Sequence, residues 1–380
     1  MLHYVSKAVS LMKHSSLYLN WYVDVPEVKY DFRSSGVGTF RYDLSLGEVD
    51  LSTNHAHGNP EAVALLAKRY HVASENVFTS SEGTSGQNAR IVRVLSERNP
   101  DKKQAVVEYP TYEPLLRQVQ EHFPVVERLE REESEGYRLD ADRLRKVVSA
   151  KTGLLVLTNP HLPSGAASGA SELKEVIDVA REHDFHVMCD EIYAEFNREA
   201  VPTIFSIDEE HGIATTGFSK AYGLGGLKMG VGVASKQLVD EFYADTLSTV
   251  GVFSNIVEIT MAKLLTEGRA QMEQNKQKYL RLKKDADKLL TEKSLEYFPN
   301  NSCITLWVKL PVKDTYKWIN EHTIKRHSWA AVSGAFFLFK NDYTMVKSNR
   351  IRLGVGSLNP DNPRLAEGLD VLEKALRTAQ

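Results

Sequence analysis

The 380-residue sequence is poor in features typical of secreted and membrane-spanning proteins. It has two cysteines, Cys189 and Cys303, both inside apolar runs and neither with metal-ligand spacing. They favour reduced core thiols over a disulfide framework. No apolar stretch approaches the ~20 residues that cross a bilayer, and the first 16 residues lack the apolar core and cleavage site of a signal peptide. We therefore expect a cytoplasmic protein.

An excess of positive charge is also absent. The 47 Lys and Arg residues face 50 Asp and Glu residues, a formal net charge of -3. This balance leaves no basic footprint for nucleic acid and no polybasic run for a membrane surface. There are no internal repeats, low-complexity tracts or disordered linkers. We expect two or three ordinary globular domains whose partners are small molecules.

Short apolar runs alternate with amphipathic segments through the first two thirds of the chain. The runs are 77–80, 104–108, 153–157, 186–189, 212–216 and 229–234. Segments 61–70 and 171–182 carry apolar residues at helical spacing. This alternation predicts an α/β fold with a mainly parallel sheet wrapped by helices.

A second pattern follows residue 250. The long charged segment 258–290 is typical of a connecting helix. Beyond it, 303–309 and 350–354 are expected strands and 365–376 an expected closing helix. These elements predict a smaller C-terminal domain.

Polar clusters directly follow the expected strands, where ligands of such sheets gather. The clusters are Tyr109 to Tyr112, Thr158 to His161, Asp190 to Tyr193, and Ser219 with Lys220. Glycines after Lys220 allow backbone to approach a ligand, as an amine that reacts with a carbonyl cofactor requires, but an ordinary solvated lysine stays open until the rest of the chain is considered. The small-residue turn 81–88, before an expected helix at 89–95, indicates a phosphate site only weakly, because ordinary N-caps look the same.

With these clusters laid out, the chain resembles the class I and II aminotransferases of pyridoxal phosphate (PLP) fold type I from about Leu44. The matching pieces, in the family's order, are Leu46-Gly47-Glu48, Gly83-Thr84, Pro110-Thr111-Tyr112, Asn159 to Gly165, Asp190 to Tyr193, Ser219-Lys220 with Lys228, and Arg352. The resemblance implies a large domain with a seven-stranded, mainly parallel sheet, a smaller α+β C-terminal domain, and a homodimer. The expected division is an arm with part of the small domain at 1–45, the PLP-binding domain at 46–265, and the connecting helix with the small domain at 266–380.

The resemblance also implies a role for each ring-binding residue. Lys220 would bind PLP covalently and then move a proton at the substrate's α-carbon. Asp190 would pair with the ring nitrogen, and Tyr193 would donate to the ring oxygen. Tyr112 would stack on the ring, although an aromatic that merely packs remains a serious alternative.

Further residues are implied for the phosphate and the substrate. Gly83, Thr84, Lys228 and Ser219 are the expected phosphate contacts. Arg352 would grip the substrate's α-carboxylate as a bidentate fork, and Gly47 would also contact the substrate. Arg350 lies two residues earlier on the same expected strand face and is a weaker second candidate.

Three departures from the family pattern stand beside these matches. Leu162 takes the place of the asparagine that binds the ring oxygen, so Tyr193 would hold that oxygen alone or Asn159 would substitute. Gly217 replaces a phosphate-binding serine and Lys228 an arginine, which leaves Thr84, Lys228 and either Ser219 or Thr216 as anchors. The tyrosine that reaches a neighbouring subunit is missing, with Asn54 or His55 as its replacement.

The expected function is therefore PLP-dependent transfer of an amino group between an α-amino acid and a 2-oxo acid. A PLP-dependent lyase or cyclase of the same fold is the alternative. A non-catalytic binding protein and a nicotinamide dehydrogenase have less support, since Gly354-Val355-Gly356 lacks the third glycine of a dinucleotide site. The aromatic stretch 17–22 is expected to pack rather than bind ligand, and it indicates an apolar or aromatic substrate.

Overall fold

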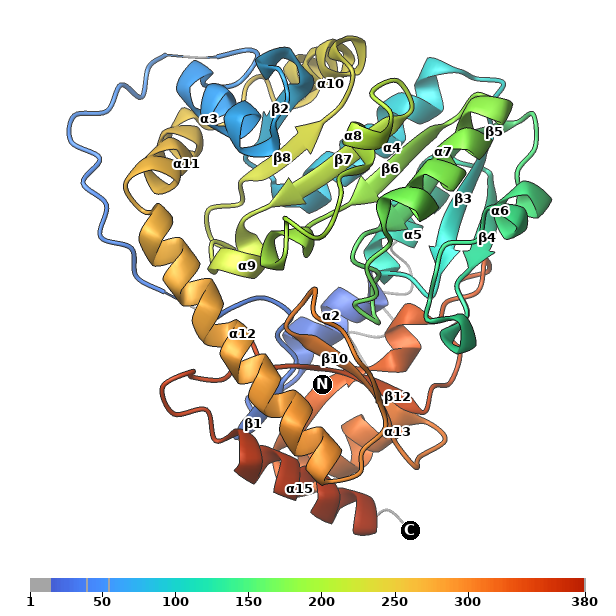
Figure 1. Cartoon of the computed structure of the whole chain (residues 1–380), viewed down its shortest axis with the longest axis vertical. Coiled ribbons are helices and arrows are strands. Elements are labelled where there is room, and N and C mark those ends of the chain that lie inside the picture. The colour runs from blue at the N-terminus through green and yellow to red at the C-terminus, as the bar shows by residue number, and fades with distance from the viewer. Residues whose placement is uncertain (1–14, 39, 54, 379–380) are drawn as a thin grey trace.

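The computed structural model describes residues 15–38, 40–53 and 55–378, which form two sheets with their helices (Figure 1). The larger sheet has seven strands in the order β2-β8-β7-β6-β5-β3-β4. Their bounds are β2 Val77–Ser80, β3 Gln104–Tyr109, β4 Val125–Glu130, β5 Thr152–Thr158, β6 His186–Asp190, β7 Gly212–Gly217 and β8 Gly230–Val233.

Strand direction in the larger sheet agrees with the predicted α/β fold. β4, β3, β5, β6 and β7 pair in parallel, while β8 runs antiparallel to both β7 and β2. The predicted seven-stranded, mainly parallel sheet is confirmed. The sequence analysis missed β4, an edge strand whose residues are mostly exposed or half-buried.

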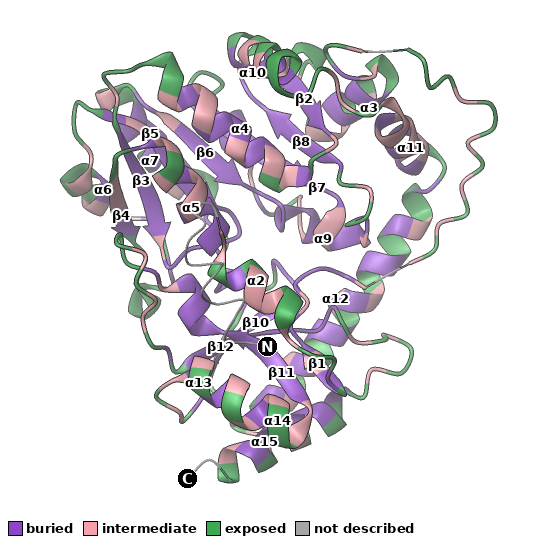
Figure 2. Ribbon diagram, turned by 180° about the vertical axis from the view of Figure 1, so that it is seen from behind, coloured by how far each residue is buried: buried purple, intermediate pink, exposed green. Residues whose placement is uncertain are grey.

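Helices cover both faces of this sheet because alternate strand residues point to opposite sides. In β3, Ala105 and Val107 pack with helices α4, α5 and α10, whereas Val106 packs with α6, α7 and α8. Figure 2 shows α4 and α10 on the face toward the viewer. Their bounds are α4 Gly83–Arg98, α5 Glu113–His122, α6 Ala141–Val147, α7 Ala170–His183, α8 Ile204–Ile207 and α10 Lys236–Thr249.

The smaller sheet has five strands in the order β1-β11-β12-β10-β9. These are β1 Tyr30–Phe32, β9 Tyr297–Phe298, β10 Thr305–Lys309, β11 Trp329–Ser333 and β12 Arg350–Gly354. β1 pairs in parallel with β11, so the N-terminal segment is part of this otherwise C-terminal sheet. Helices α2 Leu17–Asp24, α13 Thr315–Trp318, α14 Ile324–His327 and α15 Leu365–Arg377 lie around it (Figures 1 and 2).

The connecting helix predicted at 258–290 is wrong as a single element. It is two helices, α11 Asn255–Thr266 and α12 Arg269–Glu292, separated by Glu267 and Gly268. The amides of both intervening residues donate to the Lys263 carbonyl, and glycine is among the weakest helix formers, so the first helix ends here.

The turn expected at 81–88, before a helix at 89–95, is also shorter than predicted. Its residues are already helical from Gly83, where α4 begins.

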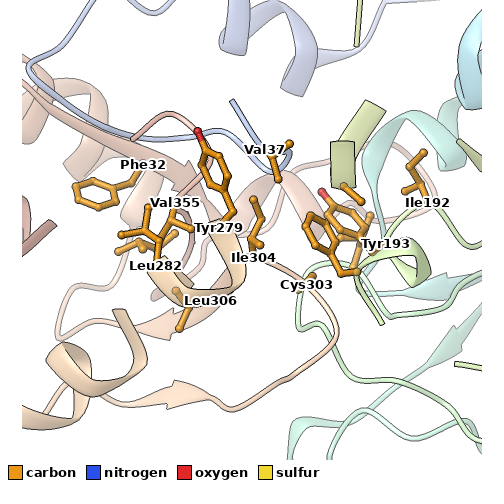
Figure 3. Packing of buried hydrophobic residues seen from close by; sticks show 14 of the residues in the cluster. Phe32, Val37, Ile192, Tyr193, Tyr279, Leu282, Cys303, Ile304, Leu306 and Val355 are labelled. Atoms are coloured by element: carbon orange, nitrogen blue, oxygen red, sulfur yellow. The ribbon is translucent and has the colours of Figure 1, made fainter. Parts of the chain in front are cut away.

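One hydrophobic cluster joins the two sheets and reaches the ends of the large-sheet strands. Figure 3 shows Phe32, Leu282 and Leu306 near the small sheet, and Val37, Ile192 and Tyr193 farther along the same cluster.

Cys189 and Cys303 are free and buried, as predicted. No helix in the described ranges is long and apolar enough to cross a membrane. The domain boundaries near residues 45 and 265 stay predictions.

Candidate active site

Lys220 lies in the short helix α9 (Ser219–Tyr222), directly after β7. Its carbonyl accepts the Val37 amide at 2.7 Å. A side chain at Gly36 would place Cβ 3.1 Å from the Lys220 Cα, so glycine permits this close approach. The Lys220 Nζ donates to the Ser35 hydroxyl at 3.2 Å. The lysine is therefore held from a segment about 185 residues earlier in the chain.

The charges around Lys220 favour a reactive amine. Burial, together with the positive charges of Arg352 and Lys228, lowers the pKa of Lys220 to about 8, against the opposing effect of Asp190. With this pKa about one amine in ten is neutral at pH 7, whereas an ordinary lysine has about one in three thousand. A neutral amine is the form that attacks a carbonyl.

Asp190 ends β6, and two protein donors meet its buried carboxylate. The Ile192 amide donates to Oδ1 at 3.0 Å, and the Asn88 amide donates to Oδ2 at 2.8 Å. Asn88 in turn accepts the Thr215 hydroxyl at 2.6 Å. Burial raises the pKa of Asp190 to about 6 and these hydrogen bonds oppose the rise, so the group is mostly ionised at neutral pH. The sequence analysis missed Asn88.

The N-terminus of α4 is the predicted phosphate contact. No side chain caps it, because the Glu82 carboxylate pairs with Arg90 at 3.0 Å instead. Gly83, at φ 71°, donates its amide to the Lys228 carbonyl at 2.6 Å, which places exposed Lys228 beside the helix start. The amides that follow Gly83 in the first turn, together with a cation at the start of a sixteen-residue helix, suit an anion.

The structure explains why glycine replaces serine at position 217. A Cβ there would lie 2.8 Å from the Thr84 hydroxyl and 3.0 Å from the Met229 carbonyl. Thr84 occupies this space because its hydroxyl donates to the Thr216 carbonyl at 3.0 Å. The Thr84 hydroxyl proton is therefore engaged within the protein, and half-buried Ser219 opens α9 nearby.

Two predicted tyrosines stand close to these groups. Burial raises the pKa of Tyr193, and the Ser35 hydroxyl, as a hydrogen-bond partner, opposes that rise. Burial also raises the pKa of Tyr112. The charge of Arg352 lowers this pKa and that of Asp190 raises it. Tyr112 meets the ring of Tyr18 edge-on at 5.9 Å, so in this structure it packs against an aromatic neighbour.

The 159–165 loop is fixed by its own hydrogen bonds and by apolar packing. The Asn159 side chain exchanges two hydrogen bonds with the Ser168 backbone, at 2.9 and 3.1 Å, so its carbonyl and one of its two N–H groups fasten the loop. Buried His161 bonds Ser164 at 2.7 Å and the Pro110 carbonyl at 3.0 Å. Leu162 is buried in the hydrophobic cluster that also contains Tyr193.

Arg352 on β12 is a buried cation without a carboxylate partner in the described ranges. It is 1% exposed and donates to the Tyr18 hydroxyl at 3.0 Å and the Arg33 carbonyl at 2.8 Å. Its Nε has no hydrogen-bond partner. Arg350, the weaker candidate, is engaged instead with Glu133 and the Trp307 carbonyl.

The loop between β1 and α3 (Pro60–Tyr70) does not bring its predicted residues to this group. Gly47 is exposed, and an added Cβ would meet no atom within 4 Å. The glycine that approaches Lys220 is Gly36. Asn54 lies outside the described residues, and half-buried His55 lies near Glu258, whose pKa its charge lowers against the larger effect of burial.

Comparison with known families decides what this arrangement belongs to. The family model for aminotransferase class I and II matches residues 43–369. The chain belongs to the class I and II aminotransferase family. It is an aminotransferase by this membership, and the enzymes of the family depend on PLP.

Individual relatives of this aminotransferase are distant but match along most of their length. Aromatic-amino-acid aminotransferase 2 of Thermococcus litoralis is 25% identical over 368 residues, 93% of this chain and 89% of the relative. A PLP-dependent aminotransferase structure from Streptococcus suis has a TM-score of 0.81 at 20% identity, over 97% of this chain and 99% of that one. Aspartate aminotransferase of Thermotoga maritima has a TM-score of 0.79 at 17% identity, over 98% of each chain. The structural matches establish the shared fold.

Four residues of the aminotransferase site were missed or undervalued by the sequence analysis. Ser35 and Gly36 contact Lys220, Asn88 contacts Asp190, and Tyr18 contacts Arg352. Tyr18 was expected only to pack, with the rest of the aromatic stretch. The available signals were weak: a Ser-Gly pair after a short strand and a polar residue five positions into a glycine-started helix.

Proposed function

We propose that this aminotransferase binds PLP through Lys220 and transfers an amino group between an α-amino acid and a 2-oxo acid. The observation that best supports this proposal is the environment of Arg352. A guanidinium that is 1% exposed and has no counter-anion in the described part of the chain is costly, unless an anionic ligand arrives to pair with it. Its planar fork suits the carboxylate that both substrates share.

The residues around Lys220 fit the cofactor. The uncapped start of α4, with Gly83, Thr84 and Lys228, would hold the phosphate together with Ser219. Asp190, ionised above pH about 6, would hold the protonated ring nitrogen. Tyr193 would donate to the ring oxygen, to which Leu162 offers no hydrogen bond, and Tyr112 would border the ring face.

When bound, the cofactor supplies an aldehyde that joins an amine and a ring that accepts electrons from the substrate's α-carbon. Lys220 supplies the attacking amine and then, once released, a base of pKa about 8 that takes and returns the α-proton. Arg352 fixes the carboxylate and so orients the α-carbon toward Lys220. Asp190 keeps negative charge at the far end of the ring.

An aromatic wall beside Arg352 supports an apolar or aromatic substrate side chain. Tyr18 packs against Phe336 at 5.5 Å and Phe337 at 6.0 Å, and the Arg352 guanidinium lies over the Tyr18 ring at 5.7 Å. Such a surface stabilises apolar groups and offers no cation to a second carboxylate. Activity confined to dicarboxylic substrates would contradict this assignment.

The enzyme is also proposed to be a homodimer. The loop between β1 and α3 extends away from the body of the chain (Figure 1), and Leu51 on it is 70% exposed. Leu247 and Val250, at the end of α10, are 50% and 47% exposed. Light scattering that measures a dimer for the wild type, and a shift toward monomer for Leu51→Asp with Leu247→Asp, would support this. A monomeric wild type would overturn it.

The decisive experiment is the absorption spectrum of the PLP-loaded protein and of Lys220→Ala. A panel of amino acids is added without any oxo acid. We expect a visible band in the wild type that is absent in the variant, and that suitable amino acids convert to the shorter-wavelength aminated cofactor. If the band persists while ammonia or an elimination product accumulates, the protein is a lyase. If supplied PLP does not bind, the proposal fails.

A further inference from the structure

Ser35 occupies a position that none of the roles above uses. It follows β1 in segment 33–37, is 7% exposed, and its hydroxyl is the acceptor for the Lys220 Nζ at 3.2 Å. The same segment is fastened to the lysine by the Val37 amide and by the close approach of Gly36. The hydroxyl is therefore placed by the backbone contacts of the two residues that follow it.

We propose that Ser35 is a further catalytic residue, whose hydroxyl orients the amine of Lys220 and strengthens Tyr193 as a hydrogen-bond donor. The proposal deepens the proposed function and depends on it, because Lys220 and Tyr193 are assigned there. It adds a contact from the N-terminal segment to a lysine that directly follows a strand of the large sheet. Ser35 would thereby influence two protonation equilibria, that of the Lys220 amine and that of the cofactor bound beside Tyr193.

The donors and acceptors of Lys220, Ser35 and Tyr193 fit together in one arrangement of hydrogen bonds. A charged lysine amine only donates, so the Ser35 oxygen accepts from it. The Ser35 hydroxyl proton is then available to the oxygen of Tyr193, whose pKa Ser35 lowers against the larger effect of burial. The Tyr193 proton is left for a ligand oxygen. Such a series of hydrogen bonds polarises each donor in turn.

The side chains near Tyr193 explain why a hydroxyl that strengthens its O–H as a donor would matter. Leu162 has no hydrogen-bonding group, and the Asn159 amide is engaged with Ser168. Tyr193 therefore lacks the second donor that an asparagine at position 162 would supply. A serine behind it compensates by making its O–H a stronger donor.

A purely structural role is the alternative, and Ser34 provides the matched control. The Ser34 hydroxyl donates to the Gly36 carbonyl at 2.9 Å, within the same turn, and touches neither Lys220 nor Tyr193. If the hydroxyls of this segment only stabilise the turn, Ser34→Ala and Ser35→Ala will behave alike.

The first test uses cofactor-free protein and does not depend on PLP binding. The rate at which a small acylating reagent modifies Lys220 is followed against pH by peptide mass spectrometry. Ser35→Ala removes an acceptor that stabilises the charged amine, so the apparent pKa should fall by about one unit. Ser34→Ala should leave it unchanged. An unchanged Ser35→Ala profile, or equal shifts in both variants, would overturn the proposal.

The second test uses PLP-loaded protein and measures the pH midpoint of its visible band. A weaker Tyr193 donor leaves the ring oxygen more basic, so the midpoint should move to higher pH in Ser35→Ala and further in Tyr193→Phe. In a Tyr193→Phe background, Ser35→Ala should add little. A full extra shift there would overturn the link to Tyr193. Failure of the wild type to form any band would instead reject the proposed function, with the acylation result still readable.

Discussion

The two sheets contribute opposite kinds of buried charge to the site. On the large sheet, the Asp190 carboxylate already has two protein donors, from Ile192 and Asn88. On the small sheet, the Arg352 guanidinium has two neutral oxygen acceptors, both at one of its terminal nitrogens, a buried Nε without a partner and no carboxylate within the described ranges. The first charge is satisfied before any ligand binds, and the second is not.

This difference separates the cofactor-binding groups of the large sheet, here called the holder, from the substrate-binding Arg352, here called the receptor. A cofactor that stays bound needs groups that are already oriented, and the large sheet provides them. A substrate that enters and leaves needs a partner that is free between turnovers, and Arg352 is such a partner. The N-terminal segment touches both sides, through Ser35 at Lys220 and Tyr18 at Arg352.

The largest expected effect tests the receptor side. Arg352→Gln removes a bidentate charged contact with the substrate carboxylate, worth about 1.5–3 kcal/mol for each of two hydrogen bonds. We expect kcat/KM to fall about a hundred-fold to ten-thousand-fold, with the visible band of the bound cofactor retained. Steady-state kinetics and the spectrum measure the two quantities separately.

Arg350→Gln is the control for this comparison, because Arg350 lies on the same strand but is paired with Glu133. It should lower the melting temperature while kcat/KM stays near that of the wild type. Equal losses of kcat/KM in both variants would show that the strand, rather than one free guanidinium, matters.

The next effect tests how closely the holder is packed. Gly217→Ser restores the family's serine but places Cβ 2.8 Å from the Thr84 hydroxyl, so we expect about 1–3 kcal/mol of destabilisation and weaker PLP binding. Thr84→Ala in the same chain removes that clash, so the double variant should lose less than the two single variants together. Denaturant unfolding and cofactor titration measure this. Simple additivity would show that the clash is not the cause.

Much of the holder could be predicted from the sequence, because each of its residues follows directly after a strand. Asp190, Lys220 and the start of α4 are placed by local pattern, and the strand positions at 77–80 and 350–354 agree with the structure residue for residue. Edge strand β4 and the break at Gly268 were missed, since neither shows a strong apolar period.

The contacts between distant segments could not be predicted in this way. Ser35 and Lys220 are 185 residues apart, and Tyr18 and Arg352 are 334 apart. No periodicity within either segment carries information about such a pairing, which depends on β1 joining the small sheet. Gly47 was predicted as a substrate contact and Gly36 was not considered, for the same reason: both are glycines in loops, and only the fold shows which one approaches Lys220.

The smallest expected effect concerns the charge of the holder. Asn88→Ala removes the donor to Asp190 Oδ2, so the pKa of that carboxyl should rise above its value of about 6 by about one unit. Because the ionised carboxylate is the active form, activity is lost as pH falls through this pKa, and the acidic limb of kcat/KM should move to higher pH. Thr215→Val, which removes only the hydroxyl that orients Asn88, should move the limb less in the same direction. A limb that stays in place while stability falls would mean that Asn88 merely packs, and that Asp190 depends on the Ile192 amide alone.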